Sequence, residues 1–195
     1  MALEQRVYSV LIVTVAEKFF EQVLPLMPGK RYYPVDKAGS INEARRCISD
    51  RSYDIILINT PLPDDFGVRF AMDVTSSTGS AVLAFVRTDL YDAVYEKAHP
   101  SGVFVLRKPT SPAAIAQSLD WLCATRERMR HMEKKSVSLQ EKMDEIKLVN
   151  RAKWVLITHL GMSEDAAHRY IEKQAMDRCL PKRTVAEDIL RTYKE

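Results

Sequence analysis

The sequence lacks several features that would place it at once in a large class of proteins. None of its apolar runs reaches the roughly 18 residues that a membrane-spanning helix needs. Its first ten residues, MALEQRVYSV, show no signal-peptide pattern. Its three cysteines, Cys47, Cys123 and Cys179, lie too far apart to match a metal-binding spacing. We therefore expect a cytoplasmic protein with reduced thiols, no membrane contact and no bound metal.

Helix-breaking residues are missing from one long stretch. Glycine is absent from residue 103 to 160 and proline from residue 113 to 180, which favours an uninterrupted helix. Apolar residues recur there in two rows spaced seven apart, the pattern of a coiled coil, and we expect a dimer. The alternative is a single amphipathic helix docked on its own domain. One row contains Leu122, Met129, Ser136, Met143 and Asn150, and the other contains Thr125, Met132, Leu139 and Ile146; the six apolar members are the expected dimer contacts.

Composition predicts a folded chain with an uneven charge. Hydrophobic residues make up 46% and charged residues 28% of the 195 residues, enough for one large or two small packed domains. The net charge is +3, but residues 125–195 hold 16 basic against 12 acidic residues. This excess favours a polyanionic partner for the C-terminal part.

The first 120 residues alternate between strand and helix signals. The strands are unbroken apolar runs, which is typical of a parallel sheet covered on both faces. We therefore predict a flavodoxin-like α/β domain with a five-stranded parallel sheet. The expected strands cover residues 7–13, 30–35, 54–58, 80–86 and 102–106, and the expected helices cover 16–27, 40–50 and 88–98, with the long helix starting near Ser111.

The last 45 residues read as three helices. The first is the end of the long helix and stops at Gly161, and Ser163 caps the second. Thr184 and Glu187 form a capping box that opens the third, like the one that Ser40 and Glu43 form further upstream. We expect a small core of Trp154, Ile157, Leu160, Ala167, Ile171 and Ala175.

The stretch DIILINTPLPDDFG, residues 54–67, has an amide, Asn59, where a strand end often presents a carboxylate. Together with Pro63, Gly67 and the Lys108-Pro109 pair, this stretch resembles the corresponding part of a response-regulator receiver domain. The resemblance covers residues 5–122, and we assign the receiver domain to residues 1–122. The resemblance implies two magnesium-binding acids after the first strand, a phosphoacceptor Asp and a hydroxyl residue ending the fourth strand. In this sequence Thr14 and Val15 stand in place of the two acids, Asn59 in place of the phosphoacceptor Asp, and Val86 in place of the hydroxyl residue. Of the family's five chemical positions only the lysine after the fifth strand, Lys108, is retained.

These replacements predict a receiver that is not phosphorylated. An amide is a poor nucleophile and cannot form the acyl phosphate, and magnesium needs anionic oxygens that Thr14 and Val15 do not offer. Asp64 or Asp65 is the alternative acceptor, although neither lies near an expected cation site. We expect Asn59 to act as a polar group that holds its loop by hydrogen bonds.

The stretch RAKWVLITHLGMSEDAAHRYIEKQAMDRCLPKRTVAEDIL resembles the ANTAR domain of bacterial antitermination regulators. Trp154 departs from the family, in which this position usually holds a small residue. We assign the ANTAR domain to residues 135–195, overlapping a coiled-coil linker at 123–150. The resemblance implies a dimer that binds two adjacent stem-loops in a nascent leader transcript and prevents a terminator hairpin.

The residues themselves are compatible with an RNA surface. Arg169 and Lys173 share one helix face, and basic side chains neutralise phosphates. Tyr170 either stacks on an unpaired base or belongs to the core. The expected RNA-binding residues are Arg151, Lys153, Arg169, Tyr170, Lys173, Gln174, Arg178, Lys182 and Arg183.

Two other readings stay open. Three helices after a receiver are also compatible with a DNA-binding response regulator, although the last helix is short and acidic. The other alternative is a dimerisation or scaffold protein that binds no nucleic acid. It stays open because the charge of residues 151–195 is nearly balanced, with 9 basic against 7 acidic residues. No nucleophile–base pair or metal cluster is evident, so we expect neither an enzyme nor a cofactor. A sensor kinase or a ligand-sensing regulator protein is the expected input.

Overall fold

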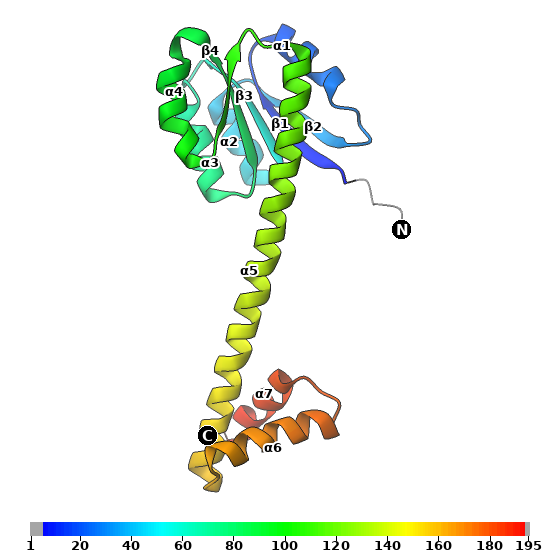
Figure 1. Ribbon diagram of the computed structural model, residues 1–195, viewed down its shortest axis with the longest axis vertical. Helices are drawn as coiled ribbons and strands as arrows, with labels where there is room; N and C mark the ends of the chain where they lie inside the picture. Colours follow the sequence, from blue (N-terminus) through cyan, green and yellow to red (C-terminus); the bar gives the residue numbers. More distant parts are fainter. Residues whose placement is uncertain (1–5, 194–195) are drawn as a thin grey trace. The chain divides into compact units, whose positions relative to one another are not determined.

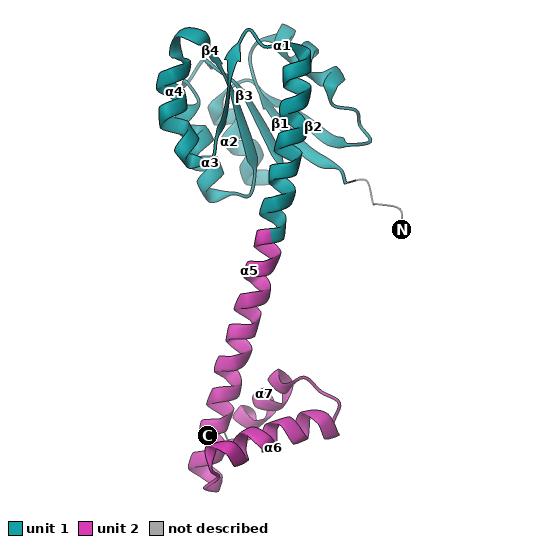
Figure 2. Ribbon diagram, in the orientation of Figure 1, with its two compact units in different colours: residues 1–131 teal, residues 132–195 magenta. Residues whose placement is uncertain are grey.

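The computed structural model describes residues 6–193, so the ends of the expected 1–122 and 135–195 domains lie partly outside the described residues. The chain divides into two compact units, residues 1–131 and 132–195 (Figure 2). One helix, α5 (Pro112–Leu160), runs through the boundary between them. The absence of glycine and proline therefore predicted an uninterrupted helix correctly.

The first unit is a parallel sheet with helices on both faces (Figure 1). The strands are β1 (Tyr8–Val13), β2 (Tyr32–Ala38), β3 (Ile55–Asn59), β4 (Ala81–Arg87) and β5 (Phe104–Lys108), in the order β2-β1-β3-β4-β5. Neighbouring strands pair in parallel throughout. The predicted flavodoxin-like fold is confirmed.

Each face of the sheet carries its own hydrophobic core. On one face pack α2 (Ile41–Asp50), α3 (Val68–Ser77) and α4 (Tyr91–Ala98), and on the other α1 (Glu17–Val23) and the start of α5. The side chains of Val10 and Ile12 point to the α1/α5 face and those of Leu11 and Val13 to the other, because side chains alternate along a strand. All four are fully buried, which explains the continuous apolar strands.

Helix ends follow local sequence signals in the first unit. Ser40 caps α2 by accepting a hydrogen bond from the backbone N–H of Glu43 at 3.1 Å, as predicted. The predicted helix over 16–27 is shorter, because α1 gives way at Leu24 to a single 3-10 turn containing Pro25. Helix α3, which the sequence reading did not place, begins after Gly67 in a left-handed conformation at φ 87°.

The second unit is a three-helix module made by the end of α5, α6 (Glu164–Asp177) and α7 (Lys182–Thr192). Gly161 ends α5 at φ 65°, and Ser163 caps α6 by accepting from the N–H of Ala166 at 3.2 Å, both as predicted. The capping box at Thr184 is wrong. Helix α7 starts three residues earlier, with Pro181 in place of Thr184 at the N-cap position, and the side chain of Glu187 pairs with Arg183, one turn before it.

The core of this module also differs from the prediction. Ala167, Ile171 and Ala175 are buried as expected, but Trp154 and Leu160 are 67% and 48% exposed. Ala152 and Leu156 take their place, one helical turn apart, and this phase turns Trp154 outward. The full buried set is Ala152, Leu156, Ala167, Ile171, Ala175, Val185, Ala186 and Ile189.

Candidate functional site

The parallel topology brings three of the predicted site residues to one edge of the sheet. Thr14 follows β1, Asn59 ends β3 and Lys108 ends β5. The Asn59 amide donates to the Thr14 hydroxyl at 3.0 Å, and its oxygen accepts from the Lys108 ammonium at 2.8 Å. The same ammonium donates to the carbonyl of Thr60. One amide therefore joins the first, third and fifth strands.

This network leaves a cation without a matching anion. Lys108 is partly buried, and its hydrogen-bond acceptors are two neutral oxygens. Burial, together with the charge of Arg87, lowers the pKa of its ammonium below the ordinary value. Lys108 thus fixes the loop after β3 through hydrogen bonds to neutral oxygens, without a carboxylate partner among the described residues.

The other two predicted site residues stay outside the network. Val15 is 54% exposed, while Val86 lies fully buried in the core on the α2/α3/α4 face. Neither side chain supplies an oxygen. Among the described residues, no group of three or more His, Cys, Asp or Glu side chains is arranged to hold a metal ion.

The two nearby acids have other structural tasks. Asp64 accepts hydrogen bonds from the backbone N–H groups of Ile41 at 3.0 Å and Asn42 at 2.9 Å, at the start of α2. These two bonds lower the pKa of its carboxyl group. Asp65 accepts from the N–H of Gly67 at 2.6 Å. Both carboxylates hold the loop in place, which argues against either one as a replacement acceptor.

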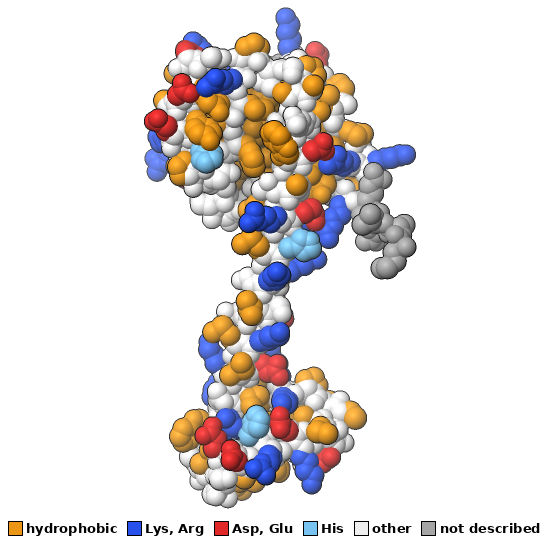
Figure 3. Space-filling view, viewed as in Figure 1, with side chains coloured by type: hydrophobic (Ala, Val, Ile, Leu, Met, Phe, Trp, Pro, Cys, Tyr) orange, Lys and Arg blue, Asp and Glu red, His pale blue; other side chains and the backbone are white. Residues whose placement is uncertain are grey.

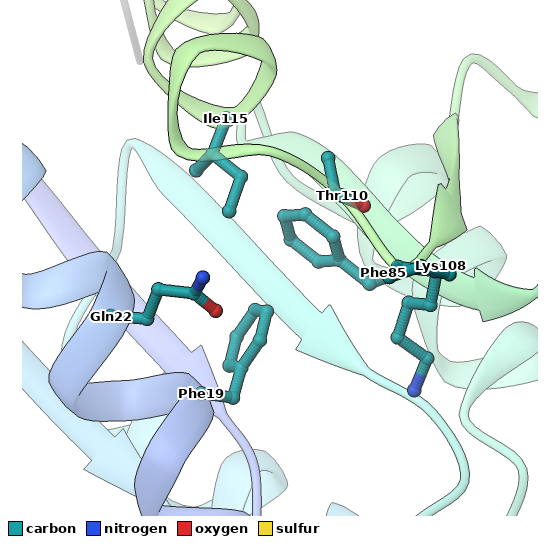
Figure 4. A pocket seen from close by; sticks show the side chains of 7 residues that line it. Phe19, Gln22, Phe85, Lys108, Thr110 and Ile115 are labelled. Carbon is teal, nitrogen blue, oxygen red and sulfur yellow. The ribbon is translucent and has the colours of Figure 1, made fainter.

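A cavity of about 440 Å³ lies beside this network, between α1 and the start of α5. Figure 4 shows Gln22 and Phe19 on one side, Ile115 and Thr110 on the other, and Phe85 between them. The rings of Phe19 and Phe85 meet edge to face, with centroids 4.9 Å apart. The amine of Lys108 points away from the two rings (Figure 4). Sequence reasoning missed this cavity, since its lining comes from four separate elements.

The middle of α5 carries a row of exposed apolar side chains. Met132, Leu139, Met143 and Ile146 are 61%, 62%, 53% and 59% exposed and follow the spacing of the predicted seam. Figure 3 shows hydrophobic side chains bare along this segment. Leu122, the first expected contact, is only 1% exposed and packs in the core of the first unit beneath the sheet. Its side chain therefore faces this chain's own core.

The predicted RNA-binding cations fall into two groups. Four of them form ion pairs with acidic side chains of the same unit: Lys153 with Glu164, Arg178 with Asp188, Lys182 with Glu172, and Arg183 with Glu187. Arg151, Arg169 and Lys173 are exposed and have no ion pair among the described residues. Arg169 and Lys173 lie on the outer face of α6, opposite its buried Ala167 and Ile171.

The two polar candidates on α6 lie on its flank. Tyr170 is 39% exposed, so its ring is neither core nor fully free, and Gln174 is partly buried. The unpaired cations Arg169 and Lys173 are therefore the more accessible part of this surface.

Comparisons with known proteins agree with both halves of this description. Residues 138–190 match the ANTAR domain family. The chain is 28% identical over 162 residues to the transcriptional regulatory protein PdtaR of Mycobacterium tuberculosis strain H37Rv, covering 83% of this chain and 78% of that protein.

Solved structures match the first unit. A signal receiver domain of an HD domain-containing protein from Pseudomonas fluorescens Pf-5 has a TM-score of 0.57 at 16% identity, over 67% of this chain and 96% of that one. A putative response regulator from Chloroflexus aurantiacus J-10-fl has a TM-score of 0.54 at 20% identity, over 61% and 99%. These likenesses give the first unit a receiver fold. None of the helices in the described part of the chain has the length and hydrophobicity to cross a bilayer.

Proposed function

Since the chain is a response regulator of the receiver-plus-ANTAR type, we propose that it is a transcription antitermination regulator of nascent leader RNA. A dimer binds two adjacent stem-loops and prevents the terminator hairpin from forming. The observation that carries this proposal is the match of residues 138–190 to the ANTAR domain. The protein acts by binding, in the cytoplasm, without a catalytic step.

The exposed row on α5 supports the dimer. Four large apolar side chains, each more than half exposed, repeat along one helix face between residues 132 and 146. Fully burying such a side chain contributes about 1.5–3 kcal/mol, so pairing two copies of this row is favourable. The ANTAR module starts within the same helix, so pairing brings two RNA-binding modules together.

The network at the receiver edge supports control without phosphorylation. Asn59 replaces the nucleophile, and Lys108 is already engaged by neutral oxygens. A sensor protein or a small ligand then supplies the input. The cavity beside Phe19 and Phe85 is one place where a ligand has room, and the surface of the receiver offers area for a partner.

A mobility-shift experiment with three nucleic acids tests the RNA function. The full-length protein is titrated against a leader RNA with two tandem hairpins, an RNA of equal length without hairpins, and duplex DNA. We expect tight binding to the tandem hairpins alone. Preferential binding to duplex DNA would favour the DNA-binding alternative, and binding to none of them would favour a scaffold.

Removing the two unpaired cations of α6 is expected to weaken this binding. Arg169→Ala with Lys173→Ala should raise the Kd for tandem hairpins at least tenfold and lower its salt slope by about one to two, since two phosphate contacts are lost. The charge-matched control is Arg178→Ala with Arg183→Ala, whose cations are held by Asp188 and Glu187. Equal losses in both variants would mean that only overall charge matters.

The receiver is expected to stay unlabelled by a phosphodonor. With acetyl phosphate and magnesium, intact-mass measurement should find no phosphoryl group on the wild type, because neither the nucleophile nor the cation ligands are present. The triple variant Thr14→Asp, Val15→Asp and Asn59→Asp restores the acidic set and should be labelled in the same assay. A phosphoryl group on wild-type Asp64 or Asp65 would contradict this proposal.

A further inference from the structure

Trp154 is the more exposed of the two tryptophans, and neither the fold nor the proposed function requires it on the surface. Its indole is 67% exposed, on the side of α5 that faces away from the module's core residues Ala152 and Leu156. Exposing a ring of this size to water is unfavourable, and exposed tryptophans are typical of binding surfaces. The ANTAR resemblance offers no explanation, since a small residue is usual there.

The indole lines a cavity of about 460 Å³ with mixed walls. Ile157 and Met162 add apolar surface, Asn150 and Ser163 add an amide and a hydroxyl, and the paired side chains of Lys153 and Glu164 complete the lining. The volume lies in the range of about 300–1,000 Å³ typical of small-molecule sites. A flat ring system with hydrogen-bonding edges suits such walls: its face packs on the indole and its edge meets the polar groups.

A second cavity of about 360 Å³ shares Asn150 and Lys153 with the first, so the two adjoin. Its lining adds Lys142, His168 and Lys182, one from each of the three helices of the module, together with the acidic Glu145 and the apolar Ile146 and Val149. Lys153 and Lys182 are paired with Glu164 and Glu172, whereas Lys142 has no ion pair among the described residues. A cavity with one aromatic wall, beside a cavity whose lining holds three lysines against one glutamate, suits a nucleotide, which has a planar base and an anionic phosphate.

We propose that one unpaired nucleotide of the RNA docks here, with its base stacked on Trp154 and its phosphate beside Lys142. This inference rests on the proposed RNA function and adds a base-reading site to it. Base stacking on aromatic side chains is how proteins hold unpaired bases, and loops are where RNA sequence is accessible. A second protein chain suits the site less, because the next two seam positions after Ile146 are the polar Asn150 and Lys153.

Fluorescence of a single tryptophan tests the stacking. The sequence contains two tryptophans, so Trp121→Phe leaves Trp154 as the only indole in the full-length protein. The probe is the tandem-hairpin RNA, together with a set in which each loop base in turn is replaced by an abasic site. We expect saturating intact RNA to quench the emission by about half or more. One abasic position should abolish the quenching.

Affinity gives the second measurement. Trp154→Ala should raise the Kd for intact RNA about tenfold, and should leave the Kd for that one abasic RNA unchanged. Trp154→Phe should recover most of the affinity, and Trp121→Phe should bind like the wild type. The side chain is exposed, so we expect Trp154→Ala to fold, which circular dichroism checks.

The outcomes separate the two proposals. If the wild type binds no tandem hairpins, the RNA function itself fails. If it binds them but Trp154→Ala binds equally well without an abasic dependence, only the nucleotide site fails. If the emission of Trp154 instead follows protein concentration without RNA, and Trp154→Ala dissociates the dimer, the indole covers a second copy and the nucleotide site is overturned.

Discussion

Asp54→Asn is expected to destabilise the first unit by about 3 kcal/mol at neutral pH, since it removes the more buried of the two anions in an ion cluster that also contains Glu127. The side chain of Asp54 is 13% exposed and accepts from Arg126 at 3.1 Å and Arg130 at 2.6 Å. The second carboxylate oxygen accepts from the backbone N–H of Ser9 at 3.1 Å. Without the carboxylate, two guanidinium groups that are 15% and 24% exposed lose their shared partner, and Arg130 keeps its ion pair with Glu127.

The pH dependence of this effect has a definite sign. Burial by itself raises the pKa of Asp54, but the bonds from Ser9 and Arg126 and the charge of Arg130 outweigh it and hold the pKa below its usual value. A carboxyl group with a lowered folded-state pKa stabilises the fold above its unfolded pKa of about 3.9. The stability difference between wild type and Asp54→Asn should therefore be constant near neutrality and shrink as the pH falls through the folded-state pKa.

Urea unfolding at a series of pH values measures this difference. In a Trp154→Phe background, the emission of Trp121 on α5 reports on the first unit alone. The matched control is Asp73→Asn, which removes an ion pair with Arg45 whose side chains are 50% and 51% exposed, and should cost less than about 1 kcal/mol. Equal costs for the two variants, or a difference that persists in acid, would show that the Asp54 cluster contributes no special stability.

The Asp54 cluster illustrates what a sequence pattern cannot predict. Arg126 and Arg130 lie 72 and 76 residues from Asp54, and nothing in the spacing or residue types joins them. The strands were predictable, because buried parallel strands leave continuous apolar runs that need only local reading. For the same reason the caps at Ser40 and Ser163 were correct, since a cap joins residues three apart.

The edge of the receiver was predictable in position but not in detail. Parallel strands put Thr14, Asn59 and Lys108 at one edge, so the residues that meet there follow from topology. That Lys108 bonds to the amide of Asn59, instead of extending into solvent, depends on side-chain conformations that the pattern does not contain. The interpretation of the site as chemically silent rests on the residue types alone and stays a prediction.

The errors in the second unit have a shared physical cause. Near residue 150, α5 is apolar on more than one side, with Ala152 and Leu156 buried and Trp154 and Leu160 exposed. Helical periodicity alone does not decide which side faces the module's core. The small side chain of Ala152 was the informative signal, because it lets α6 and α7 approach α5 closely. The prediction instead assigned the large residues Trp154 and Leu160 to the core. Likewise, Pro181 was a stronger start signal for α7 than Thr184.

Leu139→Lys combined with Ile146→Lys is expected to turn a dimer into a monomer and to weaken binding to tandem hairpins by about 100-fold or more. Both residues belong to the exposed row on α5, at 62% and 59% exposure. In a parallel coiled coil each lysine would face its own copy across the seam, so burial is lost and like charges oppose each other. Two RNA-binding modules on one particle bind adjacent hairpins with a high effective concentration, and a monomer loses that advantage.

Sedimentation equilibrium and mobility shifts on one- and two-hairpin RNAs check this expectation together. Affinity for a single hairpin should change less than about threefold, because the buried core of the ANTAR module and the cations of α6 are unchanged and only the linkage is lost. The control Val137→Lys with Ser138→Lys adds the same charge to the same segment of α5, but off the exposed row, and should stay dimeric. If Leu139→Lys with Ile146→Lys still sediments as a dimer and binds two hairpins normally, the copies must pair through another surface, and the exposed row of α5 serves some other contact.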